Sequence, residues 1–248
     1  MIVTIANQKG GVGKTTLVLN LAFLAAEEGK RVLCIDLDTQ GSLSGILTGD
    51  PAIRSRSGGA STLFSDVGNM ELDITHTSHG IDLLHGHAEL DDLDTLALEY
   101  ALSKRDSVRA MDYDIILIDT PPAIGLRQLA PLLYADVLVI PLPPEEMPVL
   151  GLSSMLETAT LAKQVNPDLR ARIILSRVKR SSSSHAEISE QLHEQLGAML
   201  MNEQVRERVA VTDAATQRVP VWKAKNADKI LRDEWRSMMA SLLTIGQD

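Results

Sequence analysis

The sequence lacks the residues and segments that would indicate a disulfide-bonded, cysteine-ligated or membrane-bound protein. One cysteine in 248 residues excludes a disulfide framework and a cysteine-ligated zinc or iron–sulfur centre. Cys34 lies in the apolar stretch RVLCID and is therefore expected to be a buried core thiol. No uninterrupted apolar stretch reaches the ~18 to 20 residues of a membrane span, and no signal peptide opens the chain. We therefore expect a cytoplasmic protein.

The composition predicts one folded domain. The chain is 44 % hydrophobic and 23 % charged, which is ordinary for a globular protein. No stretch rich in proline, glycine and serine divides it, and a chain of this length can bury one large α/β core. We therefore expect residues 1–248 to form a single domain.

Apolar runs typical of buried parallel strands alternate with segments of helical periodicity. The expected strands are 2–6, 31–36, 81–84, 113–119, 136–141 and 171–177. The expected helices are 15–28, 90–108, 125–133, 146–165, 184–196 and 227–243, and 49–61 is expected to be a surface loop. This alternation predicts an α/β fold, a doubly wound, mostly parallel sheet with helices on both faces. Ligands in such folds bind beyond the carboxyl ends of the strands.

A glycine-rich loop, KGGVGKTT, follows the first expected strand. Glycines let backbone N–H groups converge on phosphate oxygens, a lysine adds positive charge, and a hydroxyl group coordinates magnesium. The general pattern G-x-x-x-x-G-K-[ST] is not met, because Gln8 occupies the position of its first glycine. The setting of strand, glycine loop and helix still predicts nucleotide binding. The residues of this loop expected to bind it are Gly10, Gly11, Val12, Gly13, Lys14, Thr15 and Thr16.

Carboxylates stand at the ends of two expected strands. RVLCIDLD contains Asp36 and Asp38, and the apolar run YDIILID ends in Asp119, which is the form of a Walker B motif. Because magnesium prefers oxygen ligands, Thr15 and Asp119 are a chemically sensible pair for holding it.

The loop KGGVGKTT resembles the deviant Walker A motif of the MinD/ParA group of ATPases. The blocks IDLLHGHAELDDLD, YDIILIDTPPAIGLRQLAPLLYADVLVIPLPPEEMPVLGL and VRERVAVTDAATQRVPVW are similar to those of ParA-type partition ATPases, so the resemblance covers nearly the whole chain. No helix-turn-helix precedes the first strand, which matches the short form of that family. The resemblance implies an enzyme that hydrolyses ATP slowly with Mg²⁺.

The resemblance also implies roles for individual residues. Lys9 corresponds to a signature lysine that reaches the phosphates of the partner subunit, whereas Lys14 serves its own nucleotide. Asp38 corresponds to the carboxylate that positions the attacking water and belongs with Thr15 and Asp119 at the metal site. Lys9, Lys14 and Asp38 are therefore the expected catalytic residues. The family often has an adenine-contacting asparagine where this chain has Ser176, and Ser176 and Arg177 are expected to contact the nucleotide.

Charge is distributed unevenly along the chain. The net charge of −9 argues against binding nucleic acid over the whole surface, but residues 170–236 hold 13 Lys and Arg against nine Asp and Glu. An ordinary solvated surface is one interpretation of this excess. The other is a surface for the DNA backbone, and its expected residues are Arg206, Arg208, Arg218, Lys223, Lys225 and Lys229.

The family resemblance implies an ATPase that dimerises on ATP, grips nonspecific DNA, and releases it on hydrolysis. Such a protein moves a plasmid, a chromosome locus or another cargo, associates with the nucleoid in its ATP state, and has a ParB-like or adaptor partner that stimulates hydrolysis. A MinD-like membrane ATPase is one alternative, but it predicts a basic amphipathic tail, and SMMASLLTIGQD has no Lys or Arg. An ATP-dependent metabolic ligase is the other alternative.

Two short polar segments are expected to begin helices. The acidic run at residues 89–94 is expected to be a solvated helix start, where carboxylates suit the helix dipole. Ser184 with Glu187 is expected to form a capping box.

Overall fold

All the strands in the described part of the chain belong to one sheet. The computed structural model describes residues 1–64, 72–144, 149–179 and 182–245. The strand order is β3-β4-β2-β5-β1-β6-β7-β8, and only the β3–β4 pair is antiparallel among these strands. The strands are β1 Ile2–Ile5, β2 Val32–Asp36, β3 Thr75–His76, β4 Ile81–Leu84, β5 Ile115–Asp119, β6 Val137–Leu142, β7 Arg170–Val178 and β8 Leu200–Arg206.

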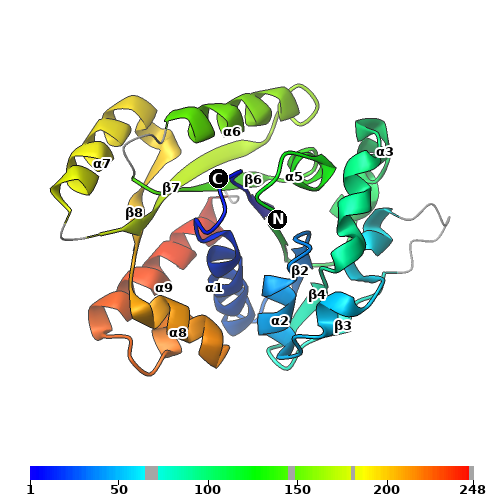
Figure 1. Ribbon diagram of the computed structural model, residues 1–248, viewed down its shortest axis with the longest axis horizontal. Helices are drawn as coiled ribbons and strands as arrows, with labels where there is room; N and C mark the ends of the chain where they lie inside the picture. Colours follow the sequence, from blue (N-terminus) through cyan, green and yellow to red (C-terminus); the bar gives the residue numbers. More distant parts are fainter. Residues whose placement is uncertain (65–71, 145–148, 180–181, 246–248) are drawn as a thin grey trace.

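Helices cover both faces of this sheet (Figure 1). One face carries α1 Lys14–Glu27, α2 Ser42–Thr48, α8 Val209–Gln217 and α9 Lys229–Thr244. The other carries α3 Leu98–Ser103, α4 Arg105–Arg109, α5 Leu126–Leu132, α6 Val149–Ala162 and α7 Ser183–Leu196. Short 3₁₀ turns are η1 Ile53–Ser55, η2 Gly59–Phe64, η3 Ala88–Thr95, η4 Gly197–Met199 and η5 Val221–Lys223. The predicted doubly wound, mostly parallel α/β fold is confirmed.

The six predicted strands are confirmed to within about two residues at each end, as is usual for element boundaries. Strands β3 and β8 and helices α2 and α8 were not predicted. The edge strand β8 reads LMNEQVR, in which polar and apolar residues do not form a continuous buried run. Its pairing with β7 therefore depends on tertiary contacts.

Three local predictions were wrong. The single helix at 90–108 is instead η3, α3 and α4, because Leu96 and Ala97 adopt extended ψ angles of 150° and 149°. The segment 49–61 is not wholly a surface loop, since its apolar residue Ile53 is buried in the core. The helix at 184–196 is confirmed, but Ser182 is its N-cap in place of Ser184 and accepts a hydrogen bond from the backbone of His185. The predicted start of the helix at 146 lies outside the described residues.

The strand register brings the expected site residues to one edge. β1 lies between β5 and β6, and β2 lies on the other side of β5. Asp119 is in register with Ile5 and with Asp36, so the carboxyl ends of β1, β2 and β5 are level. The chain leaves β1 directly into the glycine loop, which therefore lies beside both aspartates.

The C-terminal helix α9 is held by a buried aromatic side chain. Trp235 is 2 % exposed and belongs to the same core cluster as Leu17 and Leu21 of α1. The helix is strongly amphipathic, with its buried residues recurring at helical spacing. Packing of α9 thus supports the helix that follows the glycine loop.

We expect Trp235→Ala to lower the free energy of unfolding by ~3 to 5 kcal/mol, because it removes a large buried side chain and leaves a cavity. Urea unfolding followed by circular dichroism measures this change. Ile230→Ala is the matched control, since Ile230 lies in the same helix but is 61 % exposed. Equal effects of the two substitutions would show that α9 is not stabilised by its buried face.

Candidate nucleotide site

The loop between β1 and α1 has a backbone that depends on glycine at two positions. Gly11 has a φ of 72° and Gly13 a φ of 98°, in the left-handed region where side chains are strained. Gly13 directly precedes α1, and no side chain caps the helix there. The N–H groups of the first turn are therefore available to an anion, which the helix dipole also favours. This geometry suits the phosphate contacts expected of residues 9–16.

The two lysines of the loop have different surroundings. The Lys14 side chain is buried, and its Nζ donates to the carbonyl oxygens of Asn7 at 3.1 Å and Lys9 at 3.3 Å. Burial lowers the pKa of Lys14, and the negative charges of Asp119 and Asp38 oppose that shift. Lys9 is exposed at the rim, where its backbone N–H donates to Asn7 Oδ1 at 2.8 Å. A phosphate group would therefore favour the charged form of Lys14.

Thr15 and Asp119 meet as the sequence predicted. Thr15 Oγ1 donates to Asp119 Oδ2 at 2.6 Å, while Asp119 Oδ1 is buried and has no hydrogen-bond partner among the described residues. Burial raises the pKa of Asp119 well above its usual range, and the nearby Asp36 raises it further. A divalent cation would offset this cost, and both side chains supply the hard oxygen atoms that Mg²⁺ prefers. The residues present therefore fit the expected metal.

The two aspartates after β2 differ in what they contact. Asp36 is fully buried, and its Oδ2 accepts from Ser44 N at 3.0 Å and Ser44 Oγ at 2.6 Å. Its Oδ1 accepts from the backbone N–H of Asp38 at 3.1 Å. Burial raises the pKa of Asp36 despite these bonds. Asp38 is only half-buried and accepts from Gln40 N at 2.9 Å. Asp36 thus holds the turn, and Asp38 is the carboxylate able to reach a ligand.

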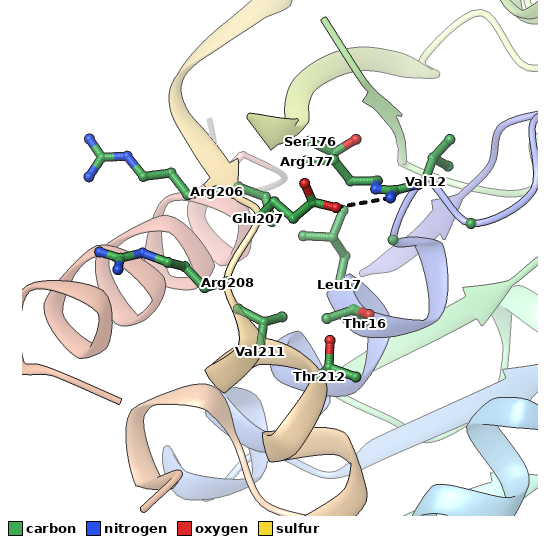
Figure 2. A pocket seen from close by; sticks show the side chains of 13 residues that line it. Val12, Thr16, Leu17, Ser176, Arg177, Arg206, Glu207, Arg208, Val211 and Thr212 are labelled. Carbon is green, nitrogen blue, oxygen red and sulfur yellow. Dashed lines mark hydrogen bonds and ion pairs between the residues drawn. The ribbon is translucent and has the colours of Figure 1, made fainter. Parts of the chain in front are cut away.

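A cavity of about 330 Å³ opens beside the glycine loop (Figure 2). Ser176 and Arg177 at the end of β7 form one wall, as expected of nucleotide-contacting residues. The Ser176 Oγ is buried and has no hydrogen-bond partner in the described part of the chain. Arg177 Nη2 pairs with Glu207 Oε1 at 2.9 Å across the opening. A cavity of this size suits a small organic group such as a base and ribose. Its other lining residues include Gly11, Val12, Gly13, Thr16, Arg206 and Thr212.

The basic residues expected to bind DNA fall into two groups. Arg206 pairs with Glu234 at 2.8 Å and Arg208 with Asp228 at 3.7 Å, which brings them to the start of α9 beside Lys229. Arg218 and Lys223 lie instead around the end of α1. Arg218 donates to the carbonyl oxygens of Ile46 and Leu47, and Lys223 pairs with Glu27 at 2.7 Å. Lys225 lies between the groups, in the connection from η5 to α9.

Sequence reasoning missed three polar residues at the site. Asn7 bridges the loop to Pro141 O at 2.8 Å, and Glu207 pairs with Arg177. Arg127 is buried and pairs with Asp94 at 2.7 Å, so the acidic run at 89–94 is not simply a solvated helix start. A basic residue following a proline- and glycine-rich loop gives no sequence signal of burial. Only the fold brings Arg127 against residues 33 positions away.

The chain is similar to a known family and to characterised proteins. A family model described as an AAA domain matches residues 1–171. The chromosome partitioning protein ParA of Myxococcus xanthus is 35 % identical over 205 residues, which cover 76 % of this chain and 69 % of that protein. The sporulation initiation inhibitor protein Soj of Bacillus subtilis is 34 % identical over 180 residues, which cover 70 % of this chain and 71 % of that protein.

A solved structure also resembles the whole chain. Cobyrinic acid a,c-diamide synthase from Mycobacterium smegmatis, with bound ADP and magnesium, superimposes with a TM-score of 0.79 at 26 % identity. The match covers 100 % of this chain and 95 % of that one. The phosphate-loop geometry, the eight-stranded sheet and these similarities agree. The chain belongs to the ParA family of partition and positioning ATPases, P-loop enzymes that hydrolyse ATP with Mg²⁺.

Proposed function

We propose that this protein is an ATP-operated switch that dimerises on ATP, binds DNA without sequence preference, and releases it on hydrolysis. The observation that carries the proposal is the opposite placement of the two loop lysines. Lys14 is buried against its own loop, whereas Lys9 is exposed at the rim. A rim lysine can reach a nucleotide bound by a second copy, which a buried lysine cannot.

Within one subunit, each residue has a distinct task. Lys14 exchanges its bonds to Asn7 O and Lys9 O for phosphate oxygens. Thr15 and Asp119 would hold Mg²⁺, which supplies positive charge to the phosphates when bound. Asp38 orients the attacking water, because its half-buried carboxylate keeps acceptor capacity after bonding Gln40 N. Ser176 and Arg177 contact the nucleoside in the adjacent cavity.

DNA binding is assigned to the group of basic residues at the start of α9. Arg206 and Arg208 keep donors beyond their single ion pairs, and Lys229 has no ion pair within the described ranges. Arg218 donates to carbonyl oxygens of α2 and Lys223 pairs with Glu27 of α1, so we assign these two residues a smaller share of the DNA contacts. The carboxylates beside the arginines reduce the local positive potential, which makes one subunit a weak binder and two joined subunits a stronger one.

The similarity to ParA and Soj supports DNA partition or cargo positioning as the process that the switch drives. A ParB-like or adaptor protein is the expected partner, and it would stimulate hydrolysis. Nucleoid association would follow from DNA binding in the ATP state.

A metabolic ligase is the second candidate, because a diamide synthase has the same overall fold at 26 % identity. That function requires a small-molecule acid and ammonia-donor chemistry, and it predicts no ATP-dependent DNA binding. A MinD-like membrane role has less support, because α9 buries most of its large apolar side chains in the core, with Ile230 exposed. No helix within the described ranges is long and apolar enough to cross a bilayer.

Lys14→Ala is expected to remove most of the ATP affinity, because each charge-assisted phosphate contact is worth about 1.5 to 3 kcal/mol. Titration with a fluorescent ATP analogue measures the loss. Lys163→Ala is the control, since Lys163 is exposed on a different part of the surface. Unchanged affinity in Lys14→Ala would contradict the assigned phosphate site.

Substitutions of Asp38 and Lys9 should leave ATP binding intact but change hydrolysis and dimerisation in different ways. Asp38→Ala is expected to bind ATP and accumulate as a dimer, because it loses the group that orients water. Lys9→Ala is expected to bind ATP but to dimerise poorly. Size-exclusion chromatography with light scattering, with and without ATP, reports both states. Normal dimerisation and turnover by Lys9→Ala would remove its role across the subunit interface.

DNA binding is expected only with ATP, and it should weaken steeply as salt rises because counterions recondense on the phosphates. Arg208→Glu and Lys229→Glu should lower affinity equally on unrelated duplexes and reduce the log–log salt slope by about one per lost phosphate contact. Mobility shifts with ADP, ATP and no nucleotide test this, with Lys163→Glu as a charge-matched control. Equal binding in all three nucleotide states would deny the switch, and no binding with ATP at low salt would favour the ligase.

A further inference from the structure

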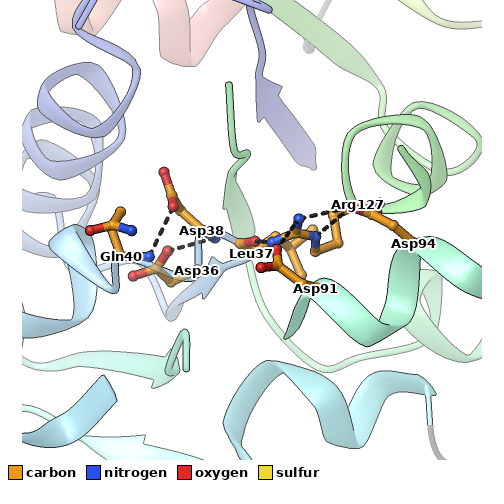
Figure 3. A network of polar contacts seen from close by, with 7 residues as sticks. All are labelled: Asp36, Leu37, Asp38, Gln40, Asp91, Asp94 and Arg127. Atoms are coloured by element: carbon orange, nitrogen blue, oxygen red, sulfur yellow. Dashed lines mark hydrogen bonds and ion pairs between the residues drawn. The ribbon is translucent and has the colours of Figure 1, made fainter. Parts of the chain in front are cut away.

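A buried arginine contacts the turn that carries Asp38 (Figure 3). Arg127, in the first turn of α5, is 4 % exposed. Its Nη1 donates to the carbonyl oxygen of Leu37 at 3.4 Å. Leu37 lies between Asp36 and Asp38, so this contact acts on the backbone immediately before the expected water-orienting carboxylate.

The arginine is held by carboxylates from η3. Asp94 Oδ2 accepts from Arg127 Nε at 3.0 Å and Nη2 at 2.7 Å, and Asp94 Oδ1 accepts from the Arg127 backbone N–H at 3.0 Å. Asp91 pairs with the same Nη2 at 2.5 Å. A buried guanidinium is tolerated only when it is paired and hydrogen-bonded in this way. Asp94 therefore balances the charge of the buried Arg127 guanidinium and fixes its orientation.

The chain is also shaped to admit Asp94. A Cβ atom placed on Gly125 would lie 2.5 Å from Asp94 Cγ and 2.5 Å from its Oδ1, closer than real contacts allow. The backbone of Gly125 is extended, with a φ of 177°, so the requirement there is for space. Gly125, Asp94 and Arg127 thus form one fitted unit, which we call the α5 clamp.

Several hydrogen bonds hold the turn after β2: Asp38 accepts from Gly41 N at its carbonyl and from Gln40 N at its carboxylate, both at 2.9 Å. Three others act on the backbone of Leu37 and Asp38. The Leu37 N–H donates to Asp119 O at 3.0 Å, and the Asp38 N–H donates to Asp36 Oδ1 at 3.1 Å. The α5 clamp supplies the third, at Leu37 O. The first bond comes from β5 and the second from the turn itself, whereas the third joins this turn to η3 and α5. Loss of the clamp would remove the bond to the Leu37 carbonyl, and the peptide between Leu37 and Asp38 would then be held less tightly, by the Asp38 N–H bond to Asp36 Oδ1.

We propose that Arg127, held by Asp94, is a positioning residue for hydrolysis that sets the direction of the Asp38 carboxylate through the Leu37 carbonyl. This inference rests on the proposed role of Asp38. Among the described residues, none of the clamp lines the cavity in which the nucleoside is expected, and the Arg127 bonds go to Asp94, Asp91 and Leu37 O and not to the glycine loop. The clamp therefore contributes to the orientation of water and not to ATP binding, which predicts an effect on kcat without one on KM.

The test compares Arg127→Met, Arg127→Lys and Asp94→Asn with the wild-type protein in ATP turnover with Mg²⁺. Misplacement of a catalytic group by about 1 Å can cost about 100-fold in rate, so we expect kcat to fall roughly tenfold to 100-fold in Arg127→Met and Asp94→Asn. ATP affinity, from the fluorescent analogue, should stay within about twofold. Arg127→Lys should recover part of kcat, because it keeps the charge but not the forked geometry.

Arg109 provides a matched control. It also donates to a backbone carbonyl, Tyr134 O at 2.8 Å, and to a carboxylate, Asp136 at 3.0 Å. These contacts lie at the start of β6, at the opposite edge of the sheet from the site. Arg109→Met should lower the melting temperature without lowering kcat, which separates loss of an ion pair from loss of positioning.

The double variant Asp38→Ala with Asp94→Asn, measured by single turnover, decides whether the clamp acts through Asp38. Asp94→Asn should cause no further loss in that background, whereas independent effects would multiply. Wild-type kcat in folded Asp94→Asn, or multiplied losses in the double variant, would overturn the positioning role and leave Asp38 itself untouched. Wild-type turnover by Asp38→Ala alone would overturn the proposed role of Asp38, and with it the proposed action of the clamp through Asp38.

Discussion

Burial of charge at the carboxyl edge of the sheet is the constraint on which the rest of the site depends. Asp36 and Asp119 are adjacent in register and fully or almost fully buried; burial raises the pKa of both carboxyl groups, and the charge of Asp36 raises that of Asp119 further. Lys14 is a buried cation whose pKa is lowered by burial, and the negative charges of Asp119 and Asp38 oppose that shift. The protein offsets part of the cost of burying these charges, because Ser44 and Thr15 donate to the two carboxylates and Lys14 donates to the backbone carbonyl of Asn7. Phosphate and Mg²⁺ would offset more of it, so the ligands complete a charge balance that the chain leaves incomplete.

The fold creates this edge through strand order. Parallel strands β1, β2 and β5 end at the same level. Helix α1 begins at this edge, so the positive end of its dipole lies at the same edge of the sheet as Asp36 and Asp119. The cavity beside the loop is completed by the ends of β7 and β8 and the start of α8. The C-terminal third of the chain is therefore part of the site, because it forms the wall opposite the phosphate loop.

Surface charge has a different arrangement from the one that a local excess of Lys and Arg suggests. Arg206, Arg208 and Lys223 are each within 4 Å of a carboxylate, and Arg218 is directed into the protein at the end of α2. A positive side chain beside a carboxylate still carries charge, but the potential that it projects into solvent is reduced. In the proposed switch, strong attraction for a polyanion would therefore come from two copies of this surface brought together by dimerisation.

The sequence by itself determined the architecture and the phosphate site, because both depend on local patterns. Continuous apolar runs fix buried parallel strands, and a glycine loop between a strand and a helix places Lys14 and Thr15 wherever that helix begins. The pairing of Thr15 with Asp119 also followed, since strand ends in a parallel sheet share one edge. Element boundaries at η3 and the cap of α7 did not, because short polar stretches are compatible with several local conformations.

Only the tertiary structure decided which charged residues face solvent and which face each other. Asp94 and Arg127 are 33 residues apart and have nothing in their local sequence to indicate burial, yet they meet under the turn that carries Asp38. Glu207 and Arg177 meet across the cavity in the same way. Side-chain pairing between distant segments depends on how elements pack, and hydrophobic periodicity specifies the face of a helix or strand without specifying which polar residue lies opposite it.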